Sequence, residues 1–189
     1  MRFFLVHELQ DPAHATTRLG LSFAPLSSAR SPLVDPPAAS AQCHYSRIMT
    51  ELAEIAALIH AYARRLDAGD LDGVAALFEH ATWRSASTGS VLRGTNEVRA
   101  VYDRVHLYDG SPRTKHVITN LDIALEPAAN RATAECYFTV LQGIVPGEPI
   151  QVILSGQYVD CFEKVNSRWR FSDRLFVADL IGDQRRHFG

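Results

Sequence analysis

The sequence predicts an α+β fold, in which three helices cover one face of a curved, mainly antiparallel sheet. Up to about residue 106 the apolar residues recur with the 3.6-residue period of helices, whereas from Ser111 onward they alternate with the two-residue period of strands. The segments with strand periodicity are long and are joined by short, turn-rich links, which is typical of an antiparallel meander. Helices followed by such strands indicate an α+β protein with its helices on one side of the sheet.

The first predicted helix spans residues 51–67, and the other elements are organised around it. Gly69 follows the helix and can adopt the left-handed conformation that often ends one. Tyr62 and Asp67 therefore lie near the inner end of the helix, where a phenol and a carboxylate can face the sheet. The apolar stripe that should be buried is formed by Leu52, Ile55, Ile59, Tyr62 and Leu66.

Three shorter elements are predicted next. A second helix spans residues 71–78, with Asp70 at its N-cap position. Residues 82–85 and 90–93 form two short strands around a turn. A third helix then extends from Gly94 to about residue 106, with an apolar face and a glutamate in its first turn, where negative charge is favourable.

Four long strands are predicted after the third helix. Their links are rich in Pro, Gly, Asn and Ser, which are the residues that turns favour. The predicted strands are residues 114–126, 131–145, 150–165 and 168–181.

The composition excludes several classes of protein. A net charge of −2 does not provide the basic face that nucleic-acid binding normally needs. No apolar run approaches the ~20 residues that cross a bilayer. Cys43, Cys136 and Cys161 are odd in number and far apart, and they have no zinc-like spacing, so we expect neither a disulfide framework nor a metal site. We therefore expect a cytoplasmic protein without nucleic-acid or membrane partners.

The first 46 residues differ from the rest. They contain Pro12, Pro25, Pro32, Pro36 and Pro37 among alanines and serines, with no sustained helical or strand period. Proline fixes φ and removes a hydrogen-bond donor, so we expect residues 1–46 to form an irregular or disordered arm and residues 47–189 to form the domain. Met49 stands just before the first predicted helix, and we hypothesise that the natural domain begins there.

Three short motifs occur along the predicted elements. They are Tyr62-x-x-x-x-Asp67 at the end of the first helix, Lys115-His116-x-x-x-Asn120 at the start of the first long strand, and Trp169-Arg170-Phe171-x-x-Arg174 in the last strand. Together with the order of helices and strands, these motifs resemble the SnoaL-like branch of the NTF2-like superfamily. That branch resembles scytalone dehydratase, bile-acid 7α-dehydratase, ketosteroid isomerase and the β subunits of ring-hydroxylating dioxygenases. The resemblance covers about residues 49–189.

The resemblance implies a cone-shaped α+β barrel with an apolar pocket between the helices and the concave face of the sheet, and a homodimer formed through the convex face. In the dehydratase members, a tyrosine and an aspartate near the end of the first helix act with a histidine on the first long strand. Tyr62, Asp67 and His116 occupy those places. The chain departs from the bile-acid dehydratase pattern on the following strand, where Tyr137-Phe138-Thr139 stands in place of a second carboxylate.

Each of these three residues also has a structural alternative. His116 can transfer protons near neutral pH, because its unperturbed pKa is ~6.5, or it can be an edge histidine bonded to the backbone. Asp67 can orient His116, or it can be a helix-end aspartate bonded to water, Arg64 or Arg65. Tyr62 can donate its proton to a substrate carbonyl, or it can be a core tyrosine. Side chains alternate along a strand, so His116 should share a face with Asn120, whereas residues 117, 121, 123 and 125 form the more apolar face. The alternation therefore does not decide whether His116 faces the pocket.

Other polar residues are candidates for the wall of the pocket. Arg174 lies within an apolar strand, so it should be paired with a carboxylate or bind an anionic substrate group, unless it faces the dimer partner. Asn120, Tyr137 and Trp83 are possible pocket-lining groups. We expect the end of the chain, residues 185–187, to be solvated.

The leading functional hypothesis is a cofactor-independent lyase or isomerase that acts on an apolar, carbonyl-bearing ring compound such as a steroid, a polyketide or an aromatic catabolite. The first alternative is a non-catalytic binding or assembly subunit resembling a dioxygenase β subunit, which needs an iron-bearing partner chain. A further alternative is an epoxide hydrolase, which needs an Asp-Arg-Asp cluster drawn from Asp67, Arg174 and Asp160 or Asp173.

Overall fold

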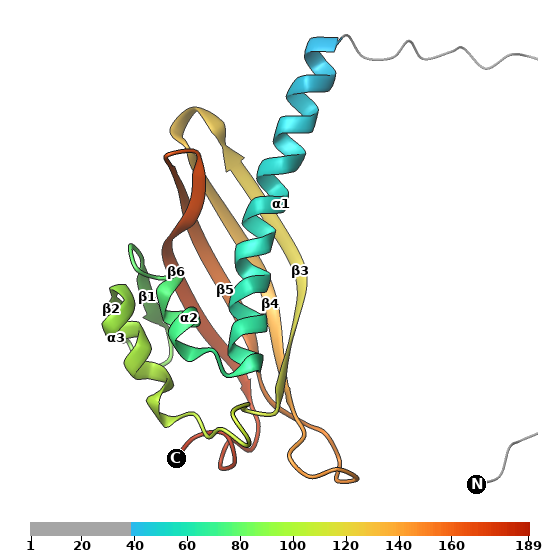
Figure 1. Cartoon of the computed structure of the whole chain (residues 1–189), viewed down its shortest axis with the longest axis vertical. Helices are drawn as coiled ribbons and strands as arrows, with labels where there is room; N and C mark the ends of the chain where they lie inside the picture. Colours follow the sequence, from blue (N-terminus) through green and yellow to red (C-terminus); the bar gives the residue numbers. More distant parts are fainter. Residues whose placement is uncertain (1–38) are drawn as a thin grey trace, which may run out of the picture. The chain divides into compact units, whose positions relative to one another are not determined.

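The computed structural model describes residues 39–189 (Figure 1). Helix α1 spans Ala39–Ala68, so it begins twelve residues before the predicted start, and residues 39–46 are helical rather than irregular. Residues 40–50 are almost all exposed, so this part of the helix carries no buried apolar stripe that could reveal it in the sequence. The rest of the predicted arm lies outside the described residues.

The remaining helices are short and agree with the predicted order. Helix α2 spans Leu71–Ala76, and Asp70 caps it by accepting a hydrogen bond from the backbone N–H of Gly73. Helix α3 spans Gly94–Val101 and continues into a 3₁₀ turn, Tyr102–Arg104. Each ends a few residues before the predicted boundary. No helix within residues 39–189 is long and apolar enough to cross a membrane.

Six strands form one curved sheet in the order β2-β1-β6-β5-β4-β3. All neighbouring strands are antiparallel except β1 and β6, which are parallel. The predicted α+β fold is therefore confirmed, and in the described residues the sheet remains open between β2 and β3 rather than closing. The strands are β1, Thr82–Ser85; β2, Val91–Arg93; β3, Thr114–Glu126; β4, Arg131–Gln142; β5, Gln151–Val165; and β6, Arg168–Ile181.

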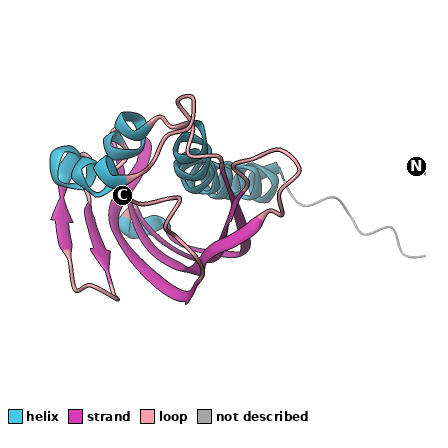
Figure 2. Ribbon diagram, turned by 90° about the horizontal axis from the view of Figure 1, so that it is seen from below, coloured by secondary structure: helices cyan, strands magenta, loops and turns pink. Residues whose placement is uncertain are grey.

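The helices lie on the concave face of the sheet, as Figure 2 shows. Helix α1 packs against β3 and β6, and α2 packs against α3. The buried apolar side chains of α1 and α2 meet those of β4, β5 and β6 in one core cluster. Burial alternates strictly along β4, so one face of that strand belongs to the core and the other is turned away from it.

A β-bulge in β3 resolves the conflicting alternation of this strand. Asn120 has φ 52°, in the left-handed region, and the register with β4 shifts between Thr119 and Asp122. One extra residue reverses the side of the sheet that the following residues face. His116 precedes the bulge and faces the helices, and the apolar residues after it, from Leu121 to Leu125, face them as well.

Gly69 holds the end of α1 close to the loop that leads into β3. It has φ 79°, and a Cβ atom there would lie 2.1 Å from the carbonyl oxygen of Gly110. Only glycine combines this conformation with this approach. The adjoining Ser111 hydroxyl donates to the backbone carbonyl of Asp67 over 3.2 Å, so the last turn of α1 is fixed beside the first residues of β3.

Candidate functional site

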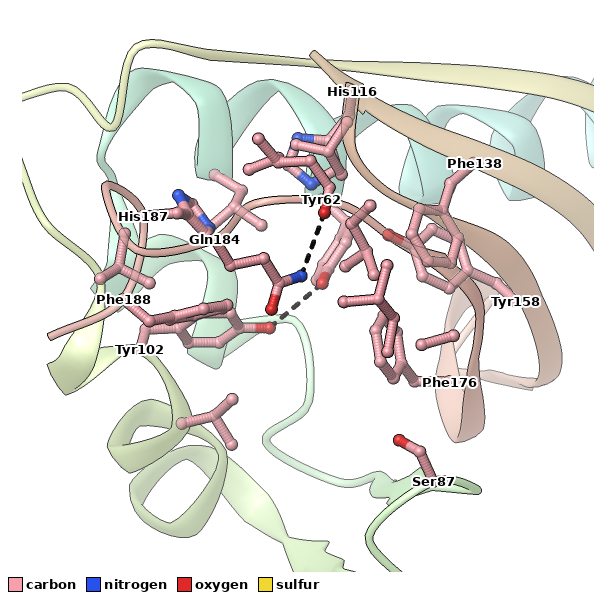
Figure 3. A pocket seen from close by; sticks show the side chains of 18 of the residues that line it. Tyr62, Ser87, Tyr102, His116, Phe138, Tyr158, Phe176, Gln184, His187 and Phe188 are labelled. Atoms are coloured by element: carbon pink, nitrogen blue, oxygen red, sulfur yellow. Dashed lines mark hydrogen bonds between the residues drawn. The ribbon is translucent and has the colours of Figure 1, made fainter. Parts of the chain in front are cut away.

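A cavity of about 210 Å³ lies between the end of α1, the 3₁₀ turn and the concave face of β4, β5 and β6 (Figure 3). Its wall is mainly aliphatic and aromatic. Within this apolar wall stand a few polar side chains from separate elements, an arrangement typical of small-molecule sites. They include Tyr62, Ser87, Tyr102, His116, Tyr158, Gln184 and His187.

Asp67 and His116 form a closely bonded pair at the cavity. The Nδ1 atom of His116 lies 2.6 Å from Oδ1 of Asp67, and the two side chains are only 5% and 10% exposed. The backbone N–H of His116 donates to Oδ2 of the same carboxylate over 2.8 Å, and the Thr114 hydroxyl donates to Oδ1 over 2.9 Å. The carboxylate therefore joins α1 to the start of β3.

The contacts of Asp67 decide between its two interpretations. Arg65 donates to the backbone carbonyl of Gly73 and lies near Asp70, so it does not pair with Asp67. Burial raises the pKa of the Asp67 carboxyl, but the hydrogen bonds from the ring and backbone of His116 and from the Thr114 hydroxyl lower it overall. Asp67 is thus an ionised acceptor near neutral pH, and the surface alternative is wrong.

This pairing determines which nitrogen of His116 is available for chemistry. A carboxylate beside Nδ1 favours the tautomer that carries its proton on Nδ1, which leaves Nε2 unprotonated. His116 lines the cavity, so Nε2 is the ring nitrogen that can accept a proton from a bound molecule. The arrangement has the parts of a general base oriented by an acid.

Tyr62 lies beside this pair and within the same cavity wall. Its ring is perpendicular to the imidazole of His116, with 6.4 Å between the ring centroids. The hydroxyl of Tyr102 donates to the hydroxyl of Tyr62 over 3.3 Å, as the dashed line that starts at Tyr102 in Figure 3 shows. The Tyr62 oxygen accepts this bond, so the proton of Tyr62 is not used in it. Burial first, and then Tyr62, raises the pKa of Tyr102 well above its usual value, so Tyr102 stays protonated.

The other predicted contact residues occupy different places. Trp83 lines the cavity, where its ring stacks on Phe176 with 5.6 Å between centroids. Asn120 and Tyr137 do not line it, so the expectation for these two residues is wrong. Asn120 is exposed at the bulge, and Tyr137 is 51% exposed because the neighbouring Phe138 occupies the inward position of β4.

Arg174 is a core residue and does not line the cavity. Its Nε and Nη2 atoms each donate to one oxygen of Asp160 over 2.7 Å, and both residues are 0% exposed. Its guanidinium carbon lies 4.3 Å from the ring centroid of Tyr62 and 4.1 Å from that of Tyr158. Burial alone lowers the pKa of Arg174, but the Asp160 carboxylate raises it overall. The predicted carboxylate partner is confirmed, and the substrate-binding and dimer-face interpretations are wrong.

The same contacts remove the basis of the epoxide hydrolase hypothesis. Arg174 and Asp160 are bonded to each other in the core, and Asp173 pairs with Arg84 outside the cavity. An Asp-Arg-Asp cluster therefore does not meet in the cavity.

Several polar cavity residues were not identified from the sequence, namely Ser87, Tyr102, Tyr158, Gln184 and His187, and His187 contradicts an explicit expectation. Residues 185–187 were expected to be solvated, and Arg185 and Arg186 are exposed, but His187 is only 6% exposed and lines the cavity. Its backbone carbonyl accepts from His106 over 2.9 Å, and Phe188 forms a β-bridge with Val105. Phe188, an aromatic residue next to a polar tail, was the one signal in the sequence for this docking.

The buried His187 should make the stability of the fold depend on pH. Burial first, and then the charges of His116 and His106, lowers its pKa from 6.5 to about 4. The unfolded chain then binds a proton between pH 6.5 and 4 that the folded chain does not, so the free energy of unfolding should fall by about 3 kcal/mol over this range. Denaturant titrations of wild type and His187→Phe across these pH values should show that the variant loses less stability. Parallel curves for the two proteins contradict this prediction.

The fold and this site define an α+β protein with a group of polar side chains in the wall of an apolar cavity. Residues 47–175 match the family model of the SnoaL-like domain, and the chain belongs to this family. No curated protein sequence matches the chain. Within residues 39–189, no group of three His, Cys, Asp or Glu side chains is placed to hold a metal ion.

Solved structures with the same fold include three from Novosphingobium aromaticivorans. An NTF2-like protein with a cystatin-like fold is 19% identical, with a TM-score of 0.61 over 77% of this chain and 91% of the other. A candidate scytalone dehydratase is 20% identical, with a TM-score of 0.59 over 74% and 91%. The β subunit of a candidate aromatic-ring-hydroxylating dioxygenase is 17% identical, with a TM-score of 0.58 over 75% and 97%. At these identities the likeness concerns the fold.

Proposed function

We propose that the protein is a cofactor-independent lyase or isomerase that removes a proton next to the carbonyl group of a small, apolar ring compound. The observation that carries this proposal is the 2.6 Å contact between Asp67 and Nδ1 of His116 in the wall of an apolar cavity. A buried imidazole with an ionised carboxylate behind it and an apolar chamber in front of it is suited to proton abstraction.

The reaction begins when Nε2 of His116 takes a proton from the carbon next to the carbonyl group. The electron pair of the broken C–H bond forms an enolate, whose oxygen accepts a hydrogen bond from Tyr62. Asp67 stabilises the imidazolium that His116 has become. The imidazolium then returns its proton either to a hydroxyl on the neighbouring carbon, which leaves as water while a C=C bond forms, or to another carbon, which gives an isomer.

The volume of the cavity limits the size of the substrate. At about 210 Å³ it is smaller than the ~300–1,000 Å³ of pockets that hold drug-sized ligands. A one- or two-ring aromatic or polyketide compound therefore fits this cavity better than a four-ring steroid. The candidate scytalone dehydratase that shares the fold is in keeping with a lyase.

Exposed apolar side chains on the convex face of the sheet support a second candidate function. Val117, Tyr137 and Val152 are 42%, 51% and 54% exposed on that face. A second copy of the chain would cover this surface in the homodimer that we propose. A larger iron-bearing chain would cover it instead if the protein is an assembly subunit, like the dioxygenase β subunit that shares its fold. Size-exclusion chromatography of the protein expressed in a native host, with iron analysis of the peak, distinguishes the two.

Hydrogen–deuterium exchange tests proton abstraction without knowledge of the natural substrate. We expect the protein to accelerate exchange of the hydrogens next to the carbonyl group in at least one of cyclohexanone, acetophenone and 1-indanone, measured by NMR in D₂O. Exchange at the buffer rate for all three contradicts the proposal.

Tyr62→Phe should lower the accelerated exchange rate by about 10- to 100-fold. Loss of a single oxyanion donor typically costs ~10²–10³ in rate, and the hydroxyl of Tyr102 remains nearby to replace part of the loss. The melting temperature should fall by only a few degrees, because the phenylalanine keeps the ring contacts of Tyr62 and only the Tyr102 hydroxyl loses its partner. Tyr45→Phe, on an exposed tyrosine of α1, is the matched control. An exchange rate for Tyr62→Phe equal to that of this control excludes Tyr62 as the oxyanion donor.

A further inference from the structure

A second imidazole faces the cavity from the C-terminal segment, residues 182–189. In Figure 3, His187 and His116 approach the cavity from different parts of the chain. His116 is bonded to Asp67, whereas Nδ1 of His187 is buried and has no hydrogen-bond partner within residues 39–189. A buried polar atom without a partner costs free energy, so its retention in the wall of a cavity points to a ligand that bonds to it.

The position of His187 is well defined by contacts that do not use its ring. The backbone carbonyl of His187 accepts from His106, the carbonyl of Arg186 accepts from the hydroxyl of Tyr108, and Gly189 exchanges hydrogen bonds with Arg104. The segment is thus tied to the loop after α3 through its backbone. The imidazole is not needed to hold the segment in place and can bond to a ligand in the cavity.

We propose that His187 is a substrate-binding residue that hydrogen-bonds to a second oxygen substituent of the ligand, away from the carbonyl group that Tyr62 binds. A neutral imidazole can both donate and accept, so a hydroxyl group on the ring is the substituent that fits it best. The substrate class becomes a one- or two-ring carbonyl compound that carries a further hydroxyl. The inference rests on the proposed function only for the carbonyl end of the ligand.

The burial of His187 supports a binding role rather than proton transfer. Its pKa of about 4 keeps the imidazole neutral at neutral pH. A neutral imidazole is a poor proton donor and, with this pKa, a weak base, but it forms hydrogen bonds without the cost of burying a charge. The two histidines therefore have different roles. His116, which is bonded to Asp67, transfers the proton, and His187, which contacts no carboxylate, binds the substrate.

The test compares the binding of acetophenone with that of 2-, 3- and 4-hydroxyacetophenone by NMR titration of the full chain. We expect at least one hydroxylated isomer to bind wild type about three- to tenfold more tightly than acetophenone, which is the range of one hydrogen bond. His187→Phe should abolish this preference and leave the affinity for acetophenone within about twofold of wild type. His187→Gln, which keeps a donor and an acceptor, should retain part of the preference, and it serves as the second variant if His187→Phe does not fold.

Arg185→Ala is the matched control, because it changes an exposed residue of the same segment. A hydroxyl preference that survives in both His187 variants, or no preference in wild type, overturns the inference. Because the titration measures binding and needs no turnover, it is independent of the exchange assay. A protein that binds hydroxyacetophenones through His187 but does not accelerate exchange leaves this inference standing and removes the proposed function.

Discussion

Replacing His116 with glutamine should lower the accelerated rate of hydrogen–deuterium exchange by about 10² to 10⁴, which is the range for loss of a general base. Glutamine has a similar length, and its amide N–H can donate to Asp67, so the bond that His116 Nδ1 makes with the carboxylate has a substitute. It cannot accept a proton from carbon. The measurement is the NMR exchange assay on the ketone that wild type processes fastest, with the melting temperature recorded in parallel.

Asp67→Asn keeps the imidazole of His116 but changes which of its nitrogens carries the proton, so it tests the role of the carboxylate. The amide of an asparagine can donate to Nδ1, which favours the tautomer with a proton on Nε2, so the nitrogen in the cavity loses its capacity as a base. The remaining amide oxygen can still accept from the backbone N–H of His116 or from Thr114. We expect a loss of rate comparable with that of His116→Gln. If a folded His116→Gln protein exchanges within a few-fold of wild type, the proposed base is wrong, whatever Asp67→Asn does.

The fold was predictable because the spacing of apolar residues that distinguishes its helices from its strands can be seen within each segment of the sequence. The change from a period of 3.6 to a period of two near Ser111 separates the helices from the sheet, and the turn residues in the links predict the antiparallel order of β3 to β6. The parallel pairing of β1 with β6 was not predictable, because it joins segments about 90 residues apart and depends on how the sheet curves. The early start of α1 was also not predictable, because an exposed stretch of helix carries no apolar stripe.

The residues of the candidate site were predictable only where the family resemblance indicated them. Tyr62, Asp67 and His116 meet at the cavity, although the alternation along β3 argued against placing His116 on the same side as Leu121. The bulge at Asn120 removes that conflict, and an asparagine in the left-handed conformation has no unique signature in a single sequence. His187 could not be assigned, since its burial depends on backbone pairing with the loop after α3.

Arg174 shows how a correct physical argument from the sequence can lead to a wrong role. A guanidinium within an apolar strand must be paired, and this requirement holds. The sequence left two partners open, a carboxylate of the protein and an anionic group of a substrate, and it also allowed a position on the dimer face. The register of β5 against β6 places Asp160 directly opposite Arg174, and this register is not visible in either strand alone.

The largest loss of stability is expected for Asp160→Ala, which should lower the free energy of unfolding by about 3–5 kcal/mol in chemical denaturation. The variant leaves a fully buried guanidinium between the rings of Tyr62 and Tyr158 without its carboxylate. An uncompensated charge of this kind costs far more than the pair contributes. The double variant Asp160→Leu with Arg174→Met, which replaces both ions by apolar side chains of similar shape, should therefore recover most of the loss.

A second ion pair between the same two strands provides the internal control. Arg170 of β6 donates to Glu163 of β5 over 2.8 Å, but its side chain is 35% exposed and that of Glu163 is 36% exposed. Water and salt screen such a pair, so Glu163→Ala should change the free energy of unfolding by less than about 1 kcal/mol. If Asp160→Ala and Glu163→Ala destabilise the protein equally, or if the double variant is no more stable than Asp160→Ala, the buried charge is not what makes Asp160 necessary. In that case the loss arises from the packing around Asp160 rather than from its bond to Arg174.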